Sequence, residues 1–192
     1  QICDENEIIC ISDEVQTGIG ITGKMWAHEH YSVKPDVISF GKKTQVCGAL
    51  AGPRIDEIEN NVFRESSRIN STFGGNLTDM IRFKLTLEVI RDENLLSNAK
   101  EKGEYLLQKI KSLSDTFPGF VTNARGIGLW AAFDLPSGTE RDHVWTEMMK
   151  NNLLILPSGD QSIRFRPHLN VNKADIDTAI EIISKSIKYS LR

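Results

Sequence analysis

Residues 13–24 read "DEVQTGIGITGK" and follow directly on the apolar run "EIICIS" of residues 7–12. Gly18, Gly20 and Gly23 have the G-x-G-x-x-G spacing of a dinucleotide-binding loop, and Lys24 completes most of the phosphate-loop pattern G-x-x-x-x-G-K. An apolar run that ends in acidic residues is typical of a buried parallel strand whose carboxyl end meets a site. The segment therefore predicts an α/β fold with a site at this edge of the sheet.

The surroundings of the glycines argue against a nucleotide ligand. A phosphate loop needs Ser or Thr after its lysine to hold magnesium, and this chain has Met25 there. A dinucleotide loop opens a long helix directly from the strand, but here Asp13 and Glu14 intervene, where their charge would repel a pyrophosphate, and Pro35 follows too soon for a long helix. Nucleotide binding is disfavoured.

A second strand predicted in "PDVISFGKK" (35–43) delivers a lysine, Lys42, to the same edge of a parallel sheet as Asp13. A carboxylate beside a lysine at this edge fits pyridoxal phosphate, because the lysine can form a Schiff base and the carboxylate can pair with the pyridinium nitrogen. That charge keeps the nitrogen protonated and strengthens the ring as an electron sink. Taken alone, such residues are more often ordinary turn residues, so this pairing leaves both interpretations open.

Composition excludes several other classes of function. The chain has 192 residues, 40% of them hydrophobic, and a formal net charge of -3 without a basic cluster for nucleic acid or anionic lipid. The short, interrupted apolar runs and the acidic start "QICDENEIIC" favour a soluble, intracellular and cytoplasmic protein. Cys3, Cys10 and Cys47 lack C-x-x-C spacing, so we expect buried free thiols and no metal site.

Periodicity further along the chain predicts helices and a second group of strands. Asn76 can cap a helix with Leu77, Ile81, Leu85 and Val89 at helical spacing. The pattern also predicts a helix from Leu95 to Pro118 and two strands about a glycine turn at 120–136. It further predicts a helix at 140–152, short strands at 153–157 and 162–167, and a terminal helix at 173–191. We predict domains at 1–92 and 93–192, the second a small α+β domain.

"ISDEVQTGIGITG" (11–23) and "KPDVISFGKKTQVCGAL" (34–50) together resemble the cofactor-lysine signature of the class III, or omega, aminotransferases. "FGKKTQVCG" (40–48), "NSTFGGNLTDM" (70–80) and "IRFRP" (163–167) are most similar to the branch of that family that acts on lysine. The resemblance covers essentially the whole chain and implies the type I pyridoxal-phosphate fold. It also implies a carboxy-terminal fragment, with residues 1–92 an incomplete large domain and 93–192 the small domain.

The resemblance assigns a role to individual residues. Asp13 would pair with the pyridine nitrogen, and Gln16 would hydrogen-bond the phenolic oxygen of the ring. Lys42 would be the Schiff-base lysine, because the family places that lysine directly after glycine; Lys43 is its neighbour and rival. Thr72 would reach a cofactor phosphate across a homodimer interface. Arg164 would bind a substrate carboxylate, for which a planar guanidinium suits better than an ammonium group.

The implied reaction moves the ε-amino group of L-lysine to 2-oxoglutarate, with pyridoxal 5'-phosphate as cofactor. Its products are 2-aminoadipate 6-semialdehyde and glutamate. Two alternatives stay open: another omega-aminotransferase acting on ornithine, 4-aminobutyrate or a diamine, and an inactive fragment with only a binding or structural role. We expect the fragment alone to be inactive.

Overall fold

A computed structural model describes residues 2–69 and 72–191, and it divides them into two compact units. The first unit holds residues 2–19, 24–69 and 72–93, and the second holds residues 20–23 and 94–191. The segment "GITG" (20–23) therefore belongs with the second half of the chain, which no linear division of the sequence anticipates.

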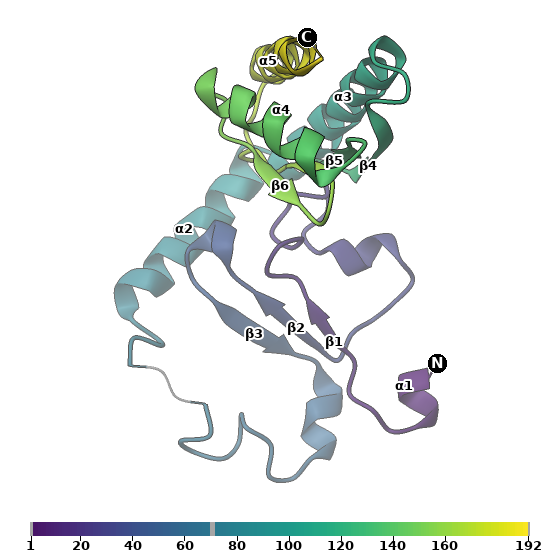
Figure 1. Cartoon of the computed structure of the whole chain (residues 1–192). Coiled ribbons are helices and arrows are strands. Elements are labelled where there is room, and N and C mark those ends of the chain that lie inside the picture. Colours follow the sequence, from purple (N-terminus) through teal and green to yellow (C-terminus); the bar gives the residue numbers. More distant parts are fainter. Residues whose placement is uncertain (1, 70–71, 192) are drawn as a thin grey trace. The chain divides into compact units, whose positions relative to one another are not determined.

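The first unit is built on a sheet in the order β1-β2-β3 (Figure 1). Its elements are α1 (Ile2–Glu5), β1 (Ile11–Asp13), the 3-10 turns η1 (Ala27–His30), η2 (Lys42–Thr44) and η3 (Pro53–Glu57), β2 (Val37–Phe40), β3 (Gly48–Ala51) and α2 (Leu77–Asp92). β1 and β2 are parallel, as the sequence predicts, with Asp13 in register with Ser39. β3 is antiparallel to β2, because the short connection 41–47 permits a reversal but not the crossover that a parallel pair needs.

Helix α2 begins where the sequence predicts, since the Asn76 side chain accepts a hydrogen bond of 2.9 Å from the Thr78 backbone N–H. The predicted apolar stripe of this helix is largely exposed in the chain described here, with exposed fractions from 79% at Leu77 to 46% at Val89. Its inward contact is made by Phe83, whose ring stacks on that of Phe40 at a centroid distance of 5.2 Å. The 3.6-residue period thus identified the helix without identifying its packed face.

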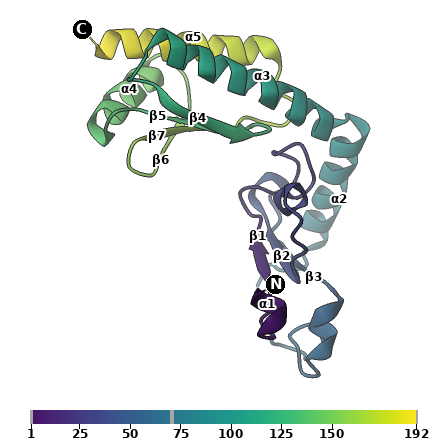
Figure 2. The same ribbon diagram turned by 90° about the vertical axis from the view of Figure 1, so that its right-hand side faces the viewer.

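The second unit has an α+β architecture, in which helices cover one face of an antiparallel sheet (Figure 2). Its elements are α3 (Leu95–Thr116), β4 (Thr122–Ile127), β5 (Trp130–Asp134), α4 (Gly138–Lys150), β6 (Leu156–Ser158), β7 (Ser162–Phe165) and α5 (Lys173–Ser190). The strand order is β4-β5-β7-β6. The predicted strand at 153–157 begins later than expected, because β6 pairs with β7 only from Leu156, opposite Arg164, to Ser158.

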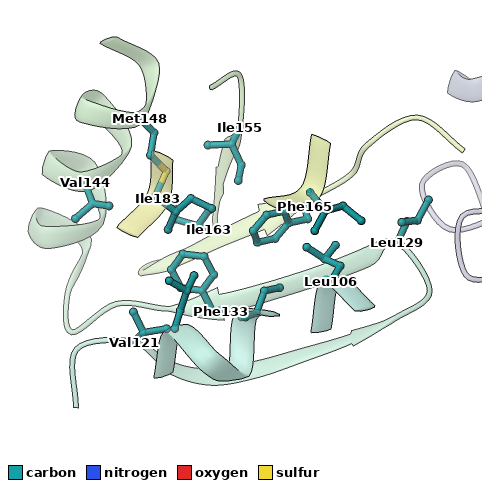
Figure 3. Packing of buried hydrophobic residues seen from close by; sticks show 14 of the residues in the cluster. Leu106, Val121, Leu129, Phe133, Val144, Met148, Ile155, Ile163, Phe165 and Ile183 are labelled. Atoms are coloured by element: carbon teal, nitrogen blue, oxygen red, sulfur yellow. The ribbon is translucent and has the colours of Figure 1, made fainter. Parts of the chain in front are cut away.

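Alternation along β5 and β7 separates a core face from an outer face. Phe133 and Ile163 are fully buried beneath the helices, and Figure 3 shows them packed with Val144 and Met148 of α4 and Ile183 of α5. Ala132 and Asp134 on β5, and Ser162 and Arg164 on β7, carry small and polar side chains on the opposite face of the sheet. That outer face includes Asp134, Ser162 and Arg164.

The helix α3 approaches the turn between β4 and β5 at a pair of glycines. A Cβ on Gly103 would overlap the backbone of Gly128, and a Cβ on Gly128 would come within 2.5 Å of the Thr22 carbonyl carbon. The Leu129 N–H also donates a hydrogen bond of 2.8 Å to the Ile21 oxygen. The segment 20–23 is thus packed tightly against α3 and this turn, which gives part of the glycine motif a structural role that needs no phosphate.

The cysteines differ in exposure from the prediction. All are unpaired thiols, as expected, but Cys47 is exposed and Cys3 and Cys10 are half-buried. Cys47 is exposed because it lies in the connection between β2 and β3 rather than inside a strand. Within the described residues, every helix is too short or too polar to span a bilayer.

Candidate functional site

Asp13 is the last residue of β1, at the carboxyl edge of the parallel pair. Its Oδ1 accepts hydrogen bonds from the Val15 backbone N–H at 3.1 Å and from the Ser39 hydroxyl at 2.9 Å. The bond from Val15, and then the bond from Ser39, hold the pKa of the Asp13 carboxyl below its ordinary value. The strand end therefore presents a carboxylate that stays ionised at neutral pH.

Lys42 lies just beyond the end of β2, with its side chain exposed. Its φ is +56°, in the left-handed region that side chains other than glycine seldom adopt. Such backbone strain concentrates at functional positions. Throughout residues 2–69 and 72–191, the Lys42 side chain has neither a hydrogen bond nor an ion pair.

Lys43 has a different environment from its neighbour. Its ammonium group donates hydrogen bonds of 2.9 Å to the backbone oxygens of Gln16 and Gly18. These bonds tie η2 to the start of the glycine motif and place Gln16, Asp13 and the 42–43 turn in one region of the first unit. Lys43 therefore anchors the loop at Gln16 and Gly18, whereas Lys42 is available for chemistry.

Glu14, which the sequence identifies only as a source of negative charge, is a structural residue of the site. It is buried, and its carboxylate accepts hydrogen bonds of 2.8 Å from the Thr17 hydroxyl and from the backbone N–H groups of Ala27 and His28. Burial alone would raise the pKa of Glu14, but the bonds from Ala27, His28 and Thr17 outweigh it and lower the pKa. Adjacent strand residues face opposite ways, so the Asp-Glu pair itself signals that one carboxylate points inward.

Thr72 lies in a turn before α2, and its side chain is exposed. The first residues of the motif "NSTFGGNLTDM", Asn70 and Ser71, lie outside the described residues. The turn as described presents the Thr72 hydroxyl at the surface of the first unit.

Arg164 lies on the outer face of the sheet of the second unit. Arg164 belongs to β7, where its register partners are Ala132 on β5 and Leu156 on β6. Its Nε is buried and has no hydrogen-bond partner among the described residues. The small Ala132 and the unsatisfied Nε leave this guanidinium suited to an external acceptor such as a carboxylate.

A polar cluster around the buried Asp134 carboxylate lies near Arg164 on the same face. Asp134 accepts hydrogen bonds from Asn123 at 2.6 Å, from Arg125 at 2.8 Å and from Ser162 at 2.5 Å. Burial would raise the pKa of Asp134, but the bonds from Ser162, Asn123 and Arg125 lower it. This cluster neutralises Arg125 and joins β4, β5 and β7.

Comparisons with known proteins decide the family. The model of the family described as aminotransferase class III matches residues 1–187. The chain belongs to the class III aminotransferase family. Its fold is accordingly the mixed α and β fold of these enzymes.

Individual relatives give the same assignment for this class III aminotransferase chain. The L-lysine-epsilon aminotransferase of Mycobacterium tuberculosis is 46% identical over 187 residues, which are 97% of this chain and 42% of that protein. A probable mitochondrial 4-aminobutyrate aminotransferase of Caenorhabditis elegans is 34% identical over 97% of this chain and 38% of that protein.

A solved structure agrees with this assignment. The lysine aminotransferase of Mycobacterium tuberculosis in its internal aldimine form matches with a TM-score of 0.95 at 46% identity, over 98% of this chain and 43% of that chain. The chain thus spans about two fifths of the length of the curated relatives it matches.

Proposed function

We propose that this chain carries the cofactor lysine and the small domain of a pyridoxal-phosphate-dependent aminotransferase for the ε-amino group of L-lysine. The observation that carries the proposal is the placement of an ionised Asp13 and an unpaired Lys42 at the carboxyl ends of two adjacent parallel strands. The higher identity to the lysine enzyme than to the 4-aminobutyrate enzyme favours lysine as the amino donor. In this proposal 2-oxoglutarate is the acceptor, and residues 1–92 and 93–192 are parts of the large and small domains.

The residues present fit pyridoxal 5'-phosphate chemically. The carboxylate of Asp13 matches a protonated pyridine nitrogen, since its lowered pKa keeps it anionic. The primary amine of Lys42 matches the cofactor aldehyde, and the Gln16 amide matches a phenolic oxygen. When bound, the cofactor supplies an electron sink for the carbon that bears the amino group of the substrate.

Lys42 would move the proton in the reaction. As a neutral amine it can accept a proton from the ε carbon of lysine and deliver it elsewhere on the bound reactants. Lys43 cannot replace it without releasing the backbone oxygens of Gln16 and Gly18. The strained backbone of Lys42 would help to aim its side chain away from this anchored neighbour.

Arg164 would bind a substrate carboxylate on the outer face of the second sheet. Its buried, unsatisfied Nε supports a fork-like interaction with both oxygens of a carboxylate. Both 2-oxoglutarate and L-lysine carry such a group. A loss of affinity for either substrate in Arg164→Lys, with the cofactor lysine unchanged, would support this assignment.

We also propose a homodimer in which Thr72 reaches the cofactor phosphate of the partner subunit. The exposed hydroxyl in the turn before α2 is compatible with an intersubunit contact. Mixing inactive Lys42→Ala and inactive Thr72→Ala subunits tests it, because a hybrid dimer would regain one intact site. If subunit exchange is demonstrated and activity does not return, the shared site is wrong.

The proposal as a whole is tested by locating the cofactor. The purified holoenzyme is reduced with borohydride, digested and mapped by mass spectrometry. We expect the cofactor on Lys42 in the wild type and in Lys43→Ala, and no cofactor adduct in Lys42→Ala. An adduct on Lys43 in the wild type would overturn the assignment.

Substrate assays separate the alternatives. Glutamate formation from 2-oxoglutarate is measured with L-lysine, ornithine, 4-aminobutyrate and a diamine as donors. We expect L-lysine to give the highest kcat/KM, and a higher value for another donor would favour another omega-aminotransferase. We expect residues 1–192 alone to form no glutamate, and turnover by this segment would contradict that part of the proposal.

A further inference from the structure

The turn that carries Lys42 has an unfavourable backbone conformation at two of its residues. Lys42 has a φ of +56° and Gln45 a φ of +55°, both in the left-handed region that side chains disfavour. Such conformations persist only where surrounding contacts hold them. The Gln45 N–H donates a hydrogen bond of 3.0 Å to the Lys42 oxygen, and the Thr44 hydroxyl donates one of 2.7 Å to the Val46 oxygen. Both bonds are local, so they shape the turn without fixing its position relative to the end of β1.

Lys43 connects this turn to a segment far away in the sequence. Its side chain is half-buried, whereas that of Lys42 is exposed. The Lys43 ammonium donates hydrogen bonds of 2.9 Å to the backbone oxygens of Gln16 and Gly18, which lie 27 and 25 residues earlier. Hydrogen bonds from an ionised donor are shorter and stronger than those between neutral groups. The turn is therefore joined to residues 16–18 through one ammonium group.

The segment that accepts these bonds is itself a closed turn. The Gly18 N–H donates a hydrogen bond of 2.8 Å to the Glu14 backbone oxygen. Gly18 also fits tightly, because an added Cβ would lie 2.8 Å from that same oxygen. Lys43 thus binds a segment whose shape is already fixed, and the position of Gln16 relative to the turn at 42–45 follows from this contact.

We propose that Lys43 is a positioning residue of the pyridoxal phosphate site, which holds Gln16 and Lys42 in the relative arrangement that cofactor binding requires. This inference rests on the proposed function, in which Lys42 meets the aldehyde of the cofactor and Gln16 its phenolic oxygen. The aldehyde and the phenolic oxygen stand on adjacent carbons of the pyridine ring. Two residues that bind adjacent groups must keep a fixed relation, and Lys43 joins the backbone of one to the turn of the other.

The chemistry of the side chain suggests two informative substitutions. A lysine ammonium carries three donors on a flexible stem, so it can serve two carbonyl oxygens at once. Lys43→Met keeps a long apolar stem and removes the charge and the donors. Lys43→Arg keeps both, in a planar group of different shape. The exposed Lys34 of the same unit provides the matched control Lys34→Met.

The first test measures cofactor affinity. The apoenzyme is titrated with pyridoxal 5'-phosphate, and binding is followed by absorption. We expect Lys43→Met to raise the Kd about tenfold, Lys43→Arg to stay within about threefold of the wild type, and Lys34→Met to leave the Kd unchanged. An unchanged Kd in Lys43→Met, or equal losses in Lys43→Met and Lys34→Met, would overturn the positioning role.

A double-substitution cycle distinguishes positioning from a general structural role. If Lys43 acts through Gln16, the combined Lys43→Met and Gln16→Ala variant should bind the cofactor within about twofold of the weaker single variant. Losses that multiply would contradict the proposal. In the apoenzyme, hydrogen exchange at the Gln45 N–H should quicken in Lys43→Met and not in Lys34→Met, because the turn loses its long-range contact. Unchanged exchange would contradict the proposal as well.

Borohydride mapping of the same samples separates this inference from the proposed function. We expect the cofactor on Lys42 in the wild type and in each Lys43 variant. A wild type without an adduct on Lys42 would overturn the proposed function and this inference together. An adduct on Lys42 with equal affinity in the wild type and in Lys43→Met would overturn the role of Lys43 alone.

Discussion

Asp13 and Ser39 are register partners on the parallel strands β1 and β2, and the Ser39 hydroxyl donates a hydrogen bond of 2.9 Å to Oδ1 of Asp13. This bond joins the two strands at the edge of the sheet where Lys42, the proposed cofactor lysine, follows β2. Parallel pairing is what places these residues side by side, because the carboxyl ends of both strands then meet at one edge. The relationship makes the ionisation of Asp13 sensitive to a residue on the neighbouring strand.

We predict that Ser39→Ala raises the pKa of Asp13 part of the way to its ordinary value. The bond from Val15, the larger cause of the lowered pKa, remains in this variant. Because the folded pKa is lowered, the stabilisation from these bonds is present above the unfolded pKa and is lost as pH falls through the folded pKa. Carboxyl-carbon NMR titration of Asp13 measures the change, with exposed Ser32→Ala as control. An unchanged titration in Ser39→Ala would contradict the role of the hydroxyl.

We predict that Glu14→Gln lowers the free energy of unfolding by about 2–3 kcal/mol near neutral pH, because a buried acceptor of backbone hydrogen bonds becomes a neutral amide. The pKa of Glu14 is lowered in the fold, so its contribution is present above the unfolded pKa and disappears as pH falls through the folded pKa. Urea unfolding at graded pH should therefore show wild type and variant converging in acid. A constant difference down to low pH would mean that the charge is irrelevant.

The matched control for this change is Glu59→Gln, which alters an exposed carboxylate of the same unit. We expect a change within about 0.5 kcal/mol, as for most surface substitutions. A loss as large as that of Glu14→Gln would show that the stabilisation is not specific to the buried carboxylate of Glu14.

The sequence predicted the elements of this fold well because most of their signals are local. Asn76 caps α2 through its own side chain, and the buried stripe of α3 has a clear helical period. The direction of β3 and the exposure of the α2 stripe depend on contacts with other segments, and periodicity alone does not specify these. The family was predicted correctly because the strand-end motifs of residues 11–23 and 34–50 are specific in combination.

The site was predicted less completely than the fold. Asp13 and Lys42 were found because both follow apolar strands directly, but their roles stay predictions. The anchoring of Lys43 by the oxygens of Gln16 and Gly18 has no sequence signal, since backbone acceptors carry no residue identity. The same holds for the segment 20–23, whose glycines match a phosphate-loop pattern while packing against α3.

We predict that Asp134→Asn destabilises the second unit by about 2–3 kcal/mol, because it replaces the buried carboxylate that accepts hydrogen bonds from Asn123, Arg125 and Ser162. The lowered pKa of Asp134 means that its stabilisation is present above the unfolded pKa and is lost as pH falls through the folded pKa. Denaturant unfolding gives the value. Asp142→Asn is the control, since the Asp142 carboxylate is exposed where it pairs with Arg141, and the change should cost less than about 1 kcal/mol. Equal losses would argue against a special role for the buried cluster.

We predict that Gly103→Ala destabilises the protein by about 3 kcal/mol, against the usual preference for alanine in a helix. Alanine favours a helix interior by about 1 kcal/mol over glycine. At this position, however, the added Cβ would overlap the backbone of Gly128, which cannot move aside as a flexible side chain could. The steric overlap should therefore outweigh the gain in helix propensity, so that Gly103→Ala lowers the free energy of unfolding.

Urea unfolding of Gly103→Ala and of Ser97→Ala provides the comparison, because both changes place alanine in α3 and Ser97 is exposed. Ser97→Ala should be neutral or stabilising by about 0.5 kcal/mol, since it gains helix propensity without a new contact. Hydrogen exchange at Leu129 N–H should quicken in Gly103→Ala alone, because displacing the Gly128 turn weakens its bond to the Ile21 oxygen. A stabilised Gly103→Ala with unchanged exchange at Leu129 would show that α3 and the turn are not in the close contact described, and that segment 20–23 is not held by it.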